Sequence, residues 1–116
     1  MSIVLADKVF PEIAAWGDEL TAIRREIHSH PELVFDTAVT VSLIVTLLKK
    51  WGIEKIDTDI VKGGVIVEID GNRPGKTVAL RADIDALPMN DCSENSWKST
   101  IEARAHAGGH DGHQTW

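Results

Sequence analysis

Three of the chain's five histidines fall within the short segment HAGGHDGH, at His106, His110 and His113. Spacings of four and three would place the imidazoles on one face of a helix, an arrangement used in metal-binding helices. Glycines interrupt this segment, and glycine is costly inside a helix but lets a loop approach a ligand closely. We therefore predict a metal-binding loop that leads into a helix. The alternative is a flexible tail that happens to contain histidine.

Two aspartates, Asp83 and Asp85, follow the apolar run TVALRA in the segment RADIDALP. Residues two apart share one face of a strand, so both carboxylates should project together where the strand ends. In an open α/β sheet, ligands bind at that edge. The carboxylates could coordinate a cation or accept the second N–H of a metal-bound imidazole. The alternative is that one caps a turn while the other is solvated.

The remaining reactive side chains give weaker signals. His28 and His30 lie two residues apart at a predicted helix end, so they point to roughly opposite sides and at most one faces a site. We interpret both as surface or internally satisfied histidines. Cys92 is the only cysteine, which excludes an intramolecular disulfide and a thiolate zinc ribbon. It has no neighbouring base in the sequence, and we interpret it as incidental.

The elements that must position these residues begin with two helices. Apolar residues at intervals of three and four predict an amphipathic helix that ends near His30, because Pro31 disfavours helical dihedral angles in the residue before it. A second helix is predicted over residues 37–51, with a broad apolar face. Gly52 is its natural carboxyl-terminal stop.

A small sheet and a long loop follow the helices. Short β-branched runs predict strands over about residues 55–61, 65–69 and 77–82. The segment from residue 89 to 109 lacks periodicity and predicts a functional loop, after which Asp111 is a candidate N-cap of a further helix. The predicted fold class is α/β, with two amino-terminal helices packed on a small mixed β-sheet.

Composition narrows the class of protein. The 116 residues are 43% apolar and 26% charged, which is typical of one globular unit. The formal net charge of -6, without a basic run, argues against nucleic acid or an acidic membrane as a partner. The amino terminus lacks the basic start of a signal peptide, and one cysteine fits a reducing compartment. We expect a cytoplasmic protein with no second domain in residues 1–116.

Four segments taken in order, RREIHSHPEL, LLKKWGI, ALRADIDALPM and HAGGHDGH, resemble the amidohydrolase family of hippurate hydrolases, N-acyl-amino-acid amidohydrolases and plant auxin-conjugate hydrolases. The resemblance covers nearly everything after about residue 20. It implies part of a zinc-peptidase-like (phosphorylase/hydrolase-like) catalytic domain, which the complete family interrupts with a smaller lid and dimerisation domain. It also implies an N-acyl amino acid substrate and divalent cofactors, namely Zn, Mn, Co or Ni.

The resemblance also assigns site residues. The family's last segment usually reads HACGHDGH, in which the cysteine and the following histidine bind a pair of divalent cations. His110 matches that histidine, while Gly108 stands where the cysteine ligand is lost. Asp83 and Asp85 match residues that support the metal pair, and Asp85 is the preferred one. Nothing in the chain identifies the substrate-binding residues.

Family members continue for a few hundred residues with a glutamate pair and two further histidine ligands. We therefore expect this chain to be the amino-terminal portion of such an enzyme, incomplete for catalysis on its own. The alternative is a non-catalytic remnant that acts, if at all, through self-association or subunit pairing. Apolar positions in 65–69 and 77–82 are expected to lack cover, and an unclosed sheet edge favours pairing into a homo-oligomer.

Overall fold

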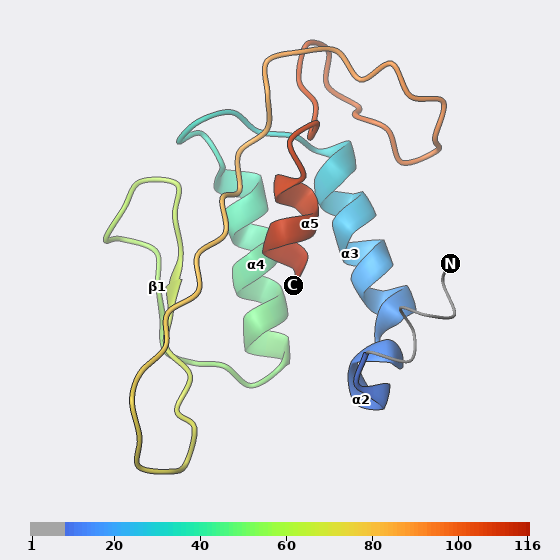
Figure 1. Cartoon of the computed structure of the whole chain (residues 1–116). Helices are drawn as coiled ribbons and strands as arrows, with labels where there is room; N and C mark the ends of the chain where they lie inside the picture. Colours follow the sequence, from blue (N-terminus) through green and yellow to red (C-terminus); the bar gives the residue numbers. More distant parts are fainter. Residues whose placement is uncertain (1–8) are drawn as a thin grey trace.

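The computed structural model describes residues 9–116, and Figure 1 shows how its elements are arranged. The helices are α2 (Pro11–Ala14), α3 (Gly17–Ser29), α4 (Ala38–Lys50) and α5 (His110–Thr115), and the strands are β1 (Ile56–Asp57) and β2 (Ile66–Val67). α5 packs against α3 although most of the sequence separates them. The segment HAGGHDGH is thereby brought back to the first long helix.

The first predicted helix is present but divided. α3 ends at Ser29, next to the predicted end at His30, whereas the residues before it form the short helix α2. The break falls at Trp16, whose ψ of 4° leaves the helical range. Asp18 and Glu19 lie in the first turn of α3, where acidic side chains interact favourably with the helix dipole. These two residues favour a new helix start there.

The second predicted helix is confirmed to within one residue at each end by α4. The Glu32 carboxylate accepts hydrogen bonds from the backbone N–H groups of Val39 at 3.1 Å and of Thr40 at 2.6 Å, which satisfies two free donors of the first turn. Gly52, with a φ of 82°, ends the helix as predicted. Within residues 9–116, no helix is long and apolar enough to cross a membrane.

The sheet is smaller than predicted. β1 and β2 pair antiparallel, with Ile56 opposite Val67, and the helices beside this hairpin confirm the α/β class. The third predicted strand is wrong, since residues 77–82 pair with no strand in the described part of the chain. A strand needs a hydrogen-bonded neighbour, and none is supplied there. Val78 and Leu80 are 82% and 97% exposed.

The turn after α3 connects the two segments that carry the candidate site. The Glu32 carbonyl accepts a hydrogen bond from the Ala86 N–H at 2.7 Å, and Leu33 forms an isolated parallel bridge with Ala86. Leu87 and Ala105 exchange two backbone hydrogen bonds, at 2.9 and 3.0 Å, in an isolated antiparallel bridge. RADIDALP therefore lies between the end of α3 and the segment that leads into α5.

The buried side chains gather around this junction and not over the sheet. Ile27, Ala86 and Ala105 are buried apolar residues, and Asp111 and His106 are buried polar ones. The predicted loop is confirmed, because residues 89–109 contain no helix or paired strand, and it folds over the end of α3 in Figure 1. The structure thus concentrates its packing where the candidate site lies.

Candidate metal-binding site

His110 is the first residue of α5 and faces the aspartates of RADIDALP. Its ring nitrogen Nδ1 lies 2.8 Å from the backbone carbonyl oxygen of Asp85 and 3.2 Å from the Asp85 carboxylate. A carbonyl oxygen only accepts hydrogen bonds, so this contact places a proton on Nδ1. Nε2 is left to act as a ligand, the arrangement found in metal-binding histidines. The Asp83 carboxylate lies 3.8 Å from Nε2.

The structure therefore brings together three residues that the sequence singled out. Asp83 and Asp85 are each about two-fifths exposed and project from an extended segment that has no strand partner in the described residues. The Arg81 guanidinium lies 2.7 Å from the Asp83 carboxylate, on the oxygen that His110 does not approach. One oxygen of Asp83 thus remains turned toward the His110 ring.

Gly108, at the position of the family's cysteine, leaves room for a side chain. A Cβ atom built there would meet only the Leu87 side chain, at 3.9 Å, which is an ordinary contact. Gly109 differs, because its φ of 85° lies in the left-handed region that favours glycine. The loop geometry therefore requires glycine at position 109 but not at position 108.

The other two histidines of HAGGHDGH point in different directions. The His113 ring lies beside that of His110, with a centroid distance of 6.0 Å. The His106 ring is buried on the other side, 6.4 Å from that of His28, and neither of its nitrogens has a hydrogen-bond partner within the described residues. Burial lowers the pKa of His106, against an opposing effect of Asp111. A loop that leads into a helix is confirmed, with His106 turned away from the other two.

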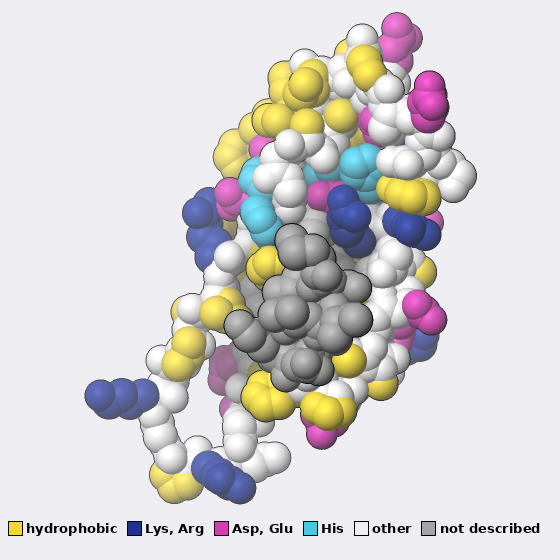
Figure 2. Space-filling model, turned by 45° about the vertical axis from the view of Figure 1, so that its right-hand side comes forward, with side chains coloured by type: hydrophobic (Ala, Val, Ile, Leu, Met, Phe, Trp, Pro, Cys, Tyr) yellow, Lys and Arg dark blue, Asp and Glu magenta, His cyan; other side chains and the backbone are white. Residues whose placement is uncertain are grey.

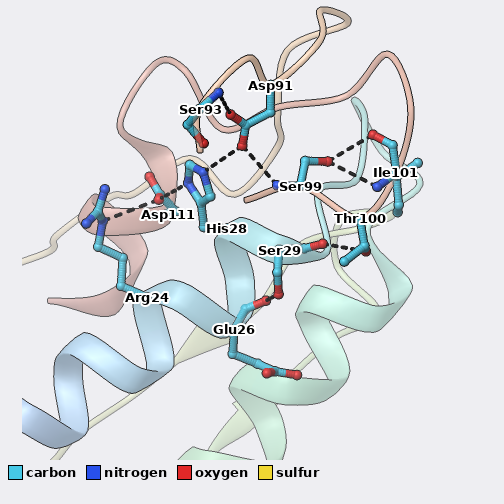
Figure 3. A network of polar contacts seen from close by, with 10 residues as sticks. All are labelled: Arg24, Glu26, His28, Ser29, Asp91, Ser93, Ser99, Thr100, Ile101 and Asp111. Atoms are coloured by element: carbon cyan, nitrogen blue, oxygen red, sulfur yellow. Dashed lines mark hydrogen bonds and ion pairs between the residues drawn. The ribbon is translucent and has the colours of Figure 1, made fainter. Parts of the chain in front are cut away.

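The predicted role of Asp111 as an N-cap is wrong. Gly109 is the N-cap residue of α5, and Asp111 lies inside the first turn with its side chain 1% exposed. Its carboxylate oxygen Oδ2 lies 2.9 Å from Nδ1 of His28 and 3.3 Å from Nε of Arg24 (Figure 3). Arg24 and His28, both on α3, compensate the cost of burying this carboxylate better than a backbone N–H group of α5 would. The carboxylate therefore contacts α3 instead of capping its own helix.

His28 was interpreted from the sequence as a satisfied or surface histidine, and it lies between two acids. Its Nε2 is 3.1 Å from the Asp91 carboxylate, whereas the side chain of His30, just after α3, is about half exposed. The Ser93 hydroxyl and the backbone N–H groups of Ser99 and Ser93 hold the pKa of Asp91 well below its usual range, so Asp91 is ionised. No local pattern could have revealed these pairs, because 63 and 83 residues separate the partners.

The residues present fit the beginning of a metal centre. His110 offers one nitrogen ligand with a supported ring, Asp83 and Asp85 lie alongside, and Gly108 contributes no donor. Among residues 9–116, no group of three or more His, Cys, Asp or Glu side chains is gathered closely enough to hold an ion. The described donors thus form an incomplete ligand set.

The chain is similar in sequence and in structure to known hydrolases and peptidases. It is 41% identical over 94% of its length to thermostable carboxypeptidase 2 of Saccharolobus solfataricus, and 41% identical over 92% to the hippurate hydrolase of Campylobacter jejuni. A solved dinuclear metal-binding peptidase of the M20 family from Bacillus subtilis matches 88% of the chain with 39% identity and a TM-score of 0.83.

These matches cover 28% of each of the three proteins, so the chain spans about a quarter of the length of the curated relatives that it matches. No model of a known protein family matches the chain. The resemblance to hippurate hydrolases and N-acyl-amino-acid amidohydrolases is confirmed, since both are among its homologues.

Proposed function

We propose that this chain, a homologue of the amino-terminal portion of M20-family amidohydrolases, forms part of a metal-dependent enzyme that cleaves the amide bond of N-acyl amino acids. The observation that carries the proposal is the His110 ring, whose Nδ1 is fixed by the Asp85 carbonyl at 2.8 Å while Nε2 stays free beside Asp83. That geometry prepares one nitrogen to bind a divalent cation.

The roles of the chain's own residues follow from this geometry. His110 would hold a cation through Nε2, and a bound cation supplies Lewis-acid polarisation of the substrate carbonyl. The Asp85 carbonyl fixes the ring orientation, and its carboxylate, 3.2 Å from Nδ1, adds negative charge behind the ring. Asp83 adds a second negative charge on the ligand side of the ring. Both aspartates act as supporting residues in this proposal.

Metal titration tests the proposal directly. We expect Gly108→Cys to tighten the binding of zinc or manganese, measured by calorimetry, by about tenfold or more, because a thiolate adds charge and a further metal bond. The side chain fits, since only Leu87 lies within 4 Å of the new Cβ. Adding His110→Ala should remove the gain. If Gly108→Cys changes nothing, the loop does not hold the metal-binding geometry.

The setting of the enzyme is part of the same proposal. The net charge of -6 and the single cysteine support a cytoplasmic protein that acts on small N-acyl amino acids, without nucleic acid or membrane partners. Because the relatives are several times longer, we expect the chain alone to show no hydrolysis of hippurate above background. Metal-dependent turnover that vanishes on His110→Ala would contradict this expectation.

A second candidate function rests on exposed apolar residues in the segment that follows β2. Ile69, Val78 and Leu80 are 71%, 82% and 97% exposed, and such strips favour association between chains. A non-catalytic chain that acts through self-association or subunit pairing is therefore the alternative, and a homo-oligomer is expected in either case. Sedimentation at several concentrations, together with the metal titration, separates a metal-binding oligomer from an inert one.

A further inference from the structure

His28 contacts the loop of His110 through a buried carboxylate. Figure 3 shows the Asp111 side chain pointing from α5 toward α3, where Arg24 and His28 meet it. Both contacts fall on the same oxygen, Oδ2, at 3.3 Å from Arg24 and 2.9 Å from His28. Arg24 is half exposed, whereas His28 is 14% exposed, so the His28 contact is the one shielded from solvent. The imidazole is therefore the main buried partner of Asp111.

α5 needs such a contact because it cannot hold itself in place. It has six residues, and helices this short are unstable without tertiary contacts. It begins after a left-handed glycine, and its N-cap makes no side-chain hydrogen bond. Asp111 is the only buried residue of α5. Because His110 precedes Asp111 directly, the contact of Asp111 with α3 fixes the first turn of α5, from which the His110 ring projects.

The second nitrogen of His28 is held as firmly. Its partner Asp91 accepts backbone hydrogen bonds from Ser99 and Ser93, both at 2.9 Å, so the carboxylate is itself fixed by the loop. Each ring nitrogen of His28 therefore lies within hydrogen-bond distance of a carboxylate, Nδ1 at 2.9 Å from Asp111 and Nε2 at 3.1 Å from Asp91. The ring is thus clamped between two anchored acids, and its orientation toward Asp111 is determined.

We propose that His28 is a positioning residue of the metal-binding loop, which acts through Asp111 to hold the His110 ring against the Asp85 carbonyl. This inference rests on the proposed metal role of His110 for its functional meaning, although the ring orientation can be measured without metal. The shape of the imidazole suggests a specific test. The amide nitrogen of asparagine replaces Nδ1, which faces Asp111, while that of glutamine replaces Nε2, which faces Asp91.

The experiment is nitrogen NMR of the histidine rings in the full chain, without metal. The parent should show His110 as a single tautomer with the proton on Nδ1, as its contact with the Asp85 carbonyl requires. His28→Asn should keep that signal, because it keeps a donor to Asp111. His28→Gln should lose it and give the averaged signal of a free imidazole. His30→Gln is the matched control at the exposed end of the same helix and should leave His110 unchanged.

The variant Asp91→Asn tests whether the His110 signal depends on the Asp111 contact in particular or on any change around His28. It weakens the loop contact of His28 but leaves the Asp111 contact, so the His110 tautomer should persist. The proposal is overturned if His28→Gln keeps the parent signal, or if His28→Asn or Asp91→Asn loses it as His28→Gln does. Circular dichroism of every variant identifies those that fail to fold, and loss of the signal in a folded His28→Asn chain remains decisive.

A zinc titration of the same variants separates this inference from the proposed function. In the Gly108→Cys background, His28→Gln should weaken zinc binding by about tenfold and His28→Asn by less, as found for residues that orient metal ligands. If none of the variants binds zinc while the tautomer results hold, the metal function fails and the positioning role stands. If zinc binds and ignores His28, the positioning role has no consequence for the site and is rejected.

Discussion

The two ends of the molecule are built in opposite ways. At the site end, α3, α5 and the segment around Ala86 are joined by buried polar contacts between residues far apart in sequence, including Asp111 and His28. At the sheet end, β1 and β2 pair through two residues each, and Ile69 and Leu80 stand 71% and 97% exposed. Figure 2 shows histidine, acidic and basic side chains gathered on the body of the molecule, while the projecting segment carries apolar side chains together with basic ones.

This difference indicates which part of the chain can keep its structure without contacts to further protein. The buried Asp111 carboxylate of the site end has its partners, Arg24 and His28, within the described residues, although the nitrogens of the buried His106 have none there. The apolar residues of the sheet end have no such cover in residues 9–116, and apolar exposure on this scale is unfavourable in water. The site end should therefore hold its structure alone, whereas the sheet end should depend on contacts with further protein.

Hydrogen exchange should give the largest difference between the ends. The N–H groups of Ala86, Leu87 and Ala105 donate to backbone carbonyls, while those of residues 77–82 donate to no partner in the described structure. We expect the first group to exchange on the order of 100-fold more slowly than the second. Similar rates in both groups would show that the comparison between the ends is wrong.

The sequence predicted one end better than the other, for a physical reason. The second helix and the end of the first agree with the prediction because their apolar periodicity and the stop at Gly52 are local signals, whereas the break at Trp16 was not predicted. The strand at 77–82 was predicted wrongly, because β-branched composition indicates a capacity to pair and not the presence of a partner.

The candidate site shows the same limit. The spacing of Asp83 and Asp85 and the histidine segment pointed to groups that the structure brings together with His110. The contact between His28 and Asp111 could not be predicted, because the partners are 83 residues apart. The sequence around each residue gives no sign of its partner. Asp111 looked like a helix cap because an aspartate near a helix start usually is one.

Removing the buried carboxylate should give the next largest effect. Asp111→Ala leaves His28 without its buried acceptor and opens the contact between α3 and α5, so we expect a loss of about 2 to 3 kcal/mol in unfolding free energy. Asp36→Ala is the control, because Asp36 is highly exposed in a surface pair with Lys62 and its removal should leave the transition unchanged. Urea unfolding measures both. Equal effects would mean that the site end is no better anchored than the surface.

Acid should weaken the site end selectively. The pKa of Asp91 is lower in the folded chain than in the unfolded chain, so the unfolded state takes up a proton first as the pH falls. The stabilisation by Asp91 is fully present above the ordinary carboxyl pKa of about 4 and is lost progressively below it. We expect Asp91→Asn to flatten the decline of stability between neutral and acidic pH. A curve with the parent's slope would show that Asp91 does not contribute through its charge.

The smallest effect on stability should come from the sheet end, where the expected change is in association. Leu80→Thr and Val78→Thr replace exposed apolar side chains with polar ones of similar or smaller size, so the folded chain loses almost no internal contact. Light scattering over a range of concentrations should show less self-association than in the parent, while the unfolding transition stays in place. Lys76→Thr, in the same exposed segment, is the matched control and should not reduce association. If the parent is a monomer at every concentration, the exposed residues do not drive pairing, and the sheet end is more self-sufficient than its exposure indicates.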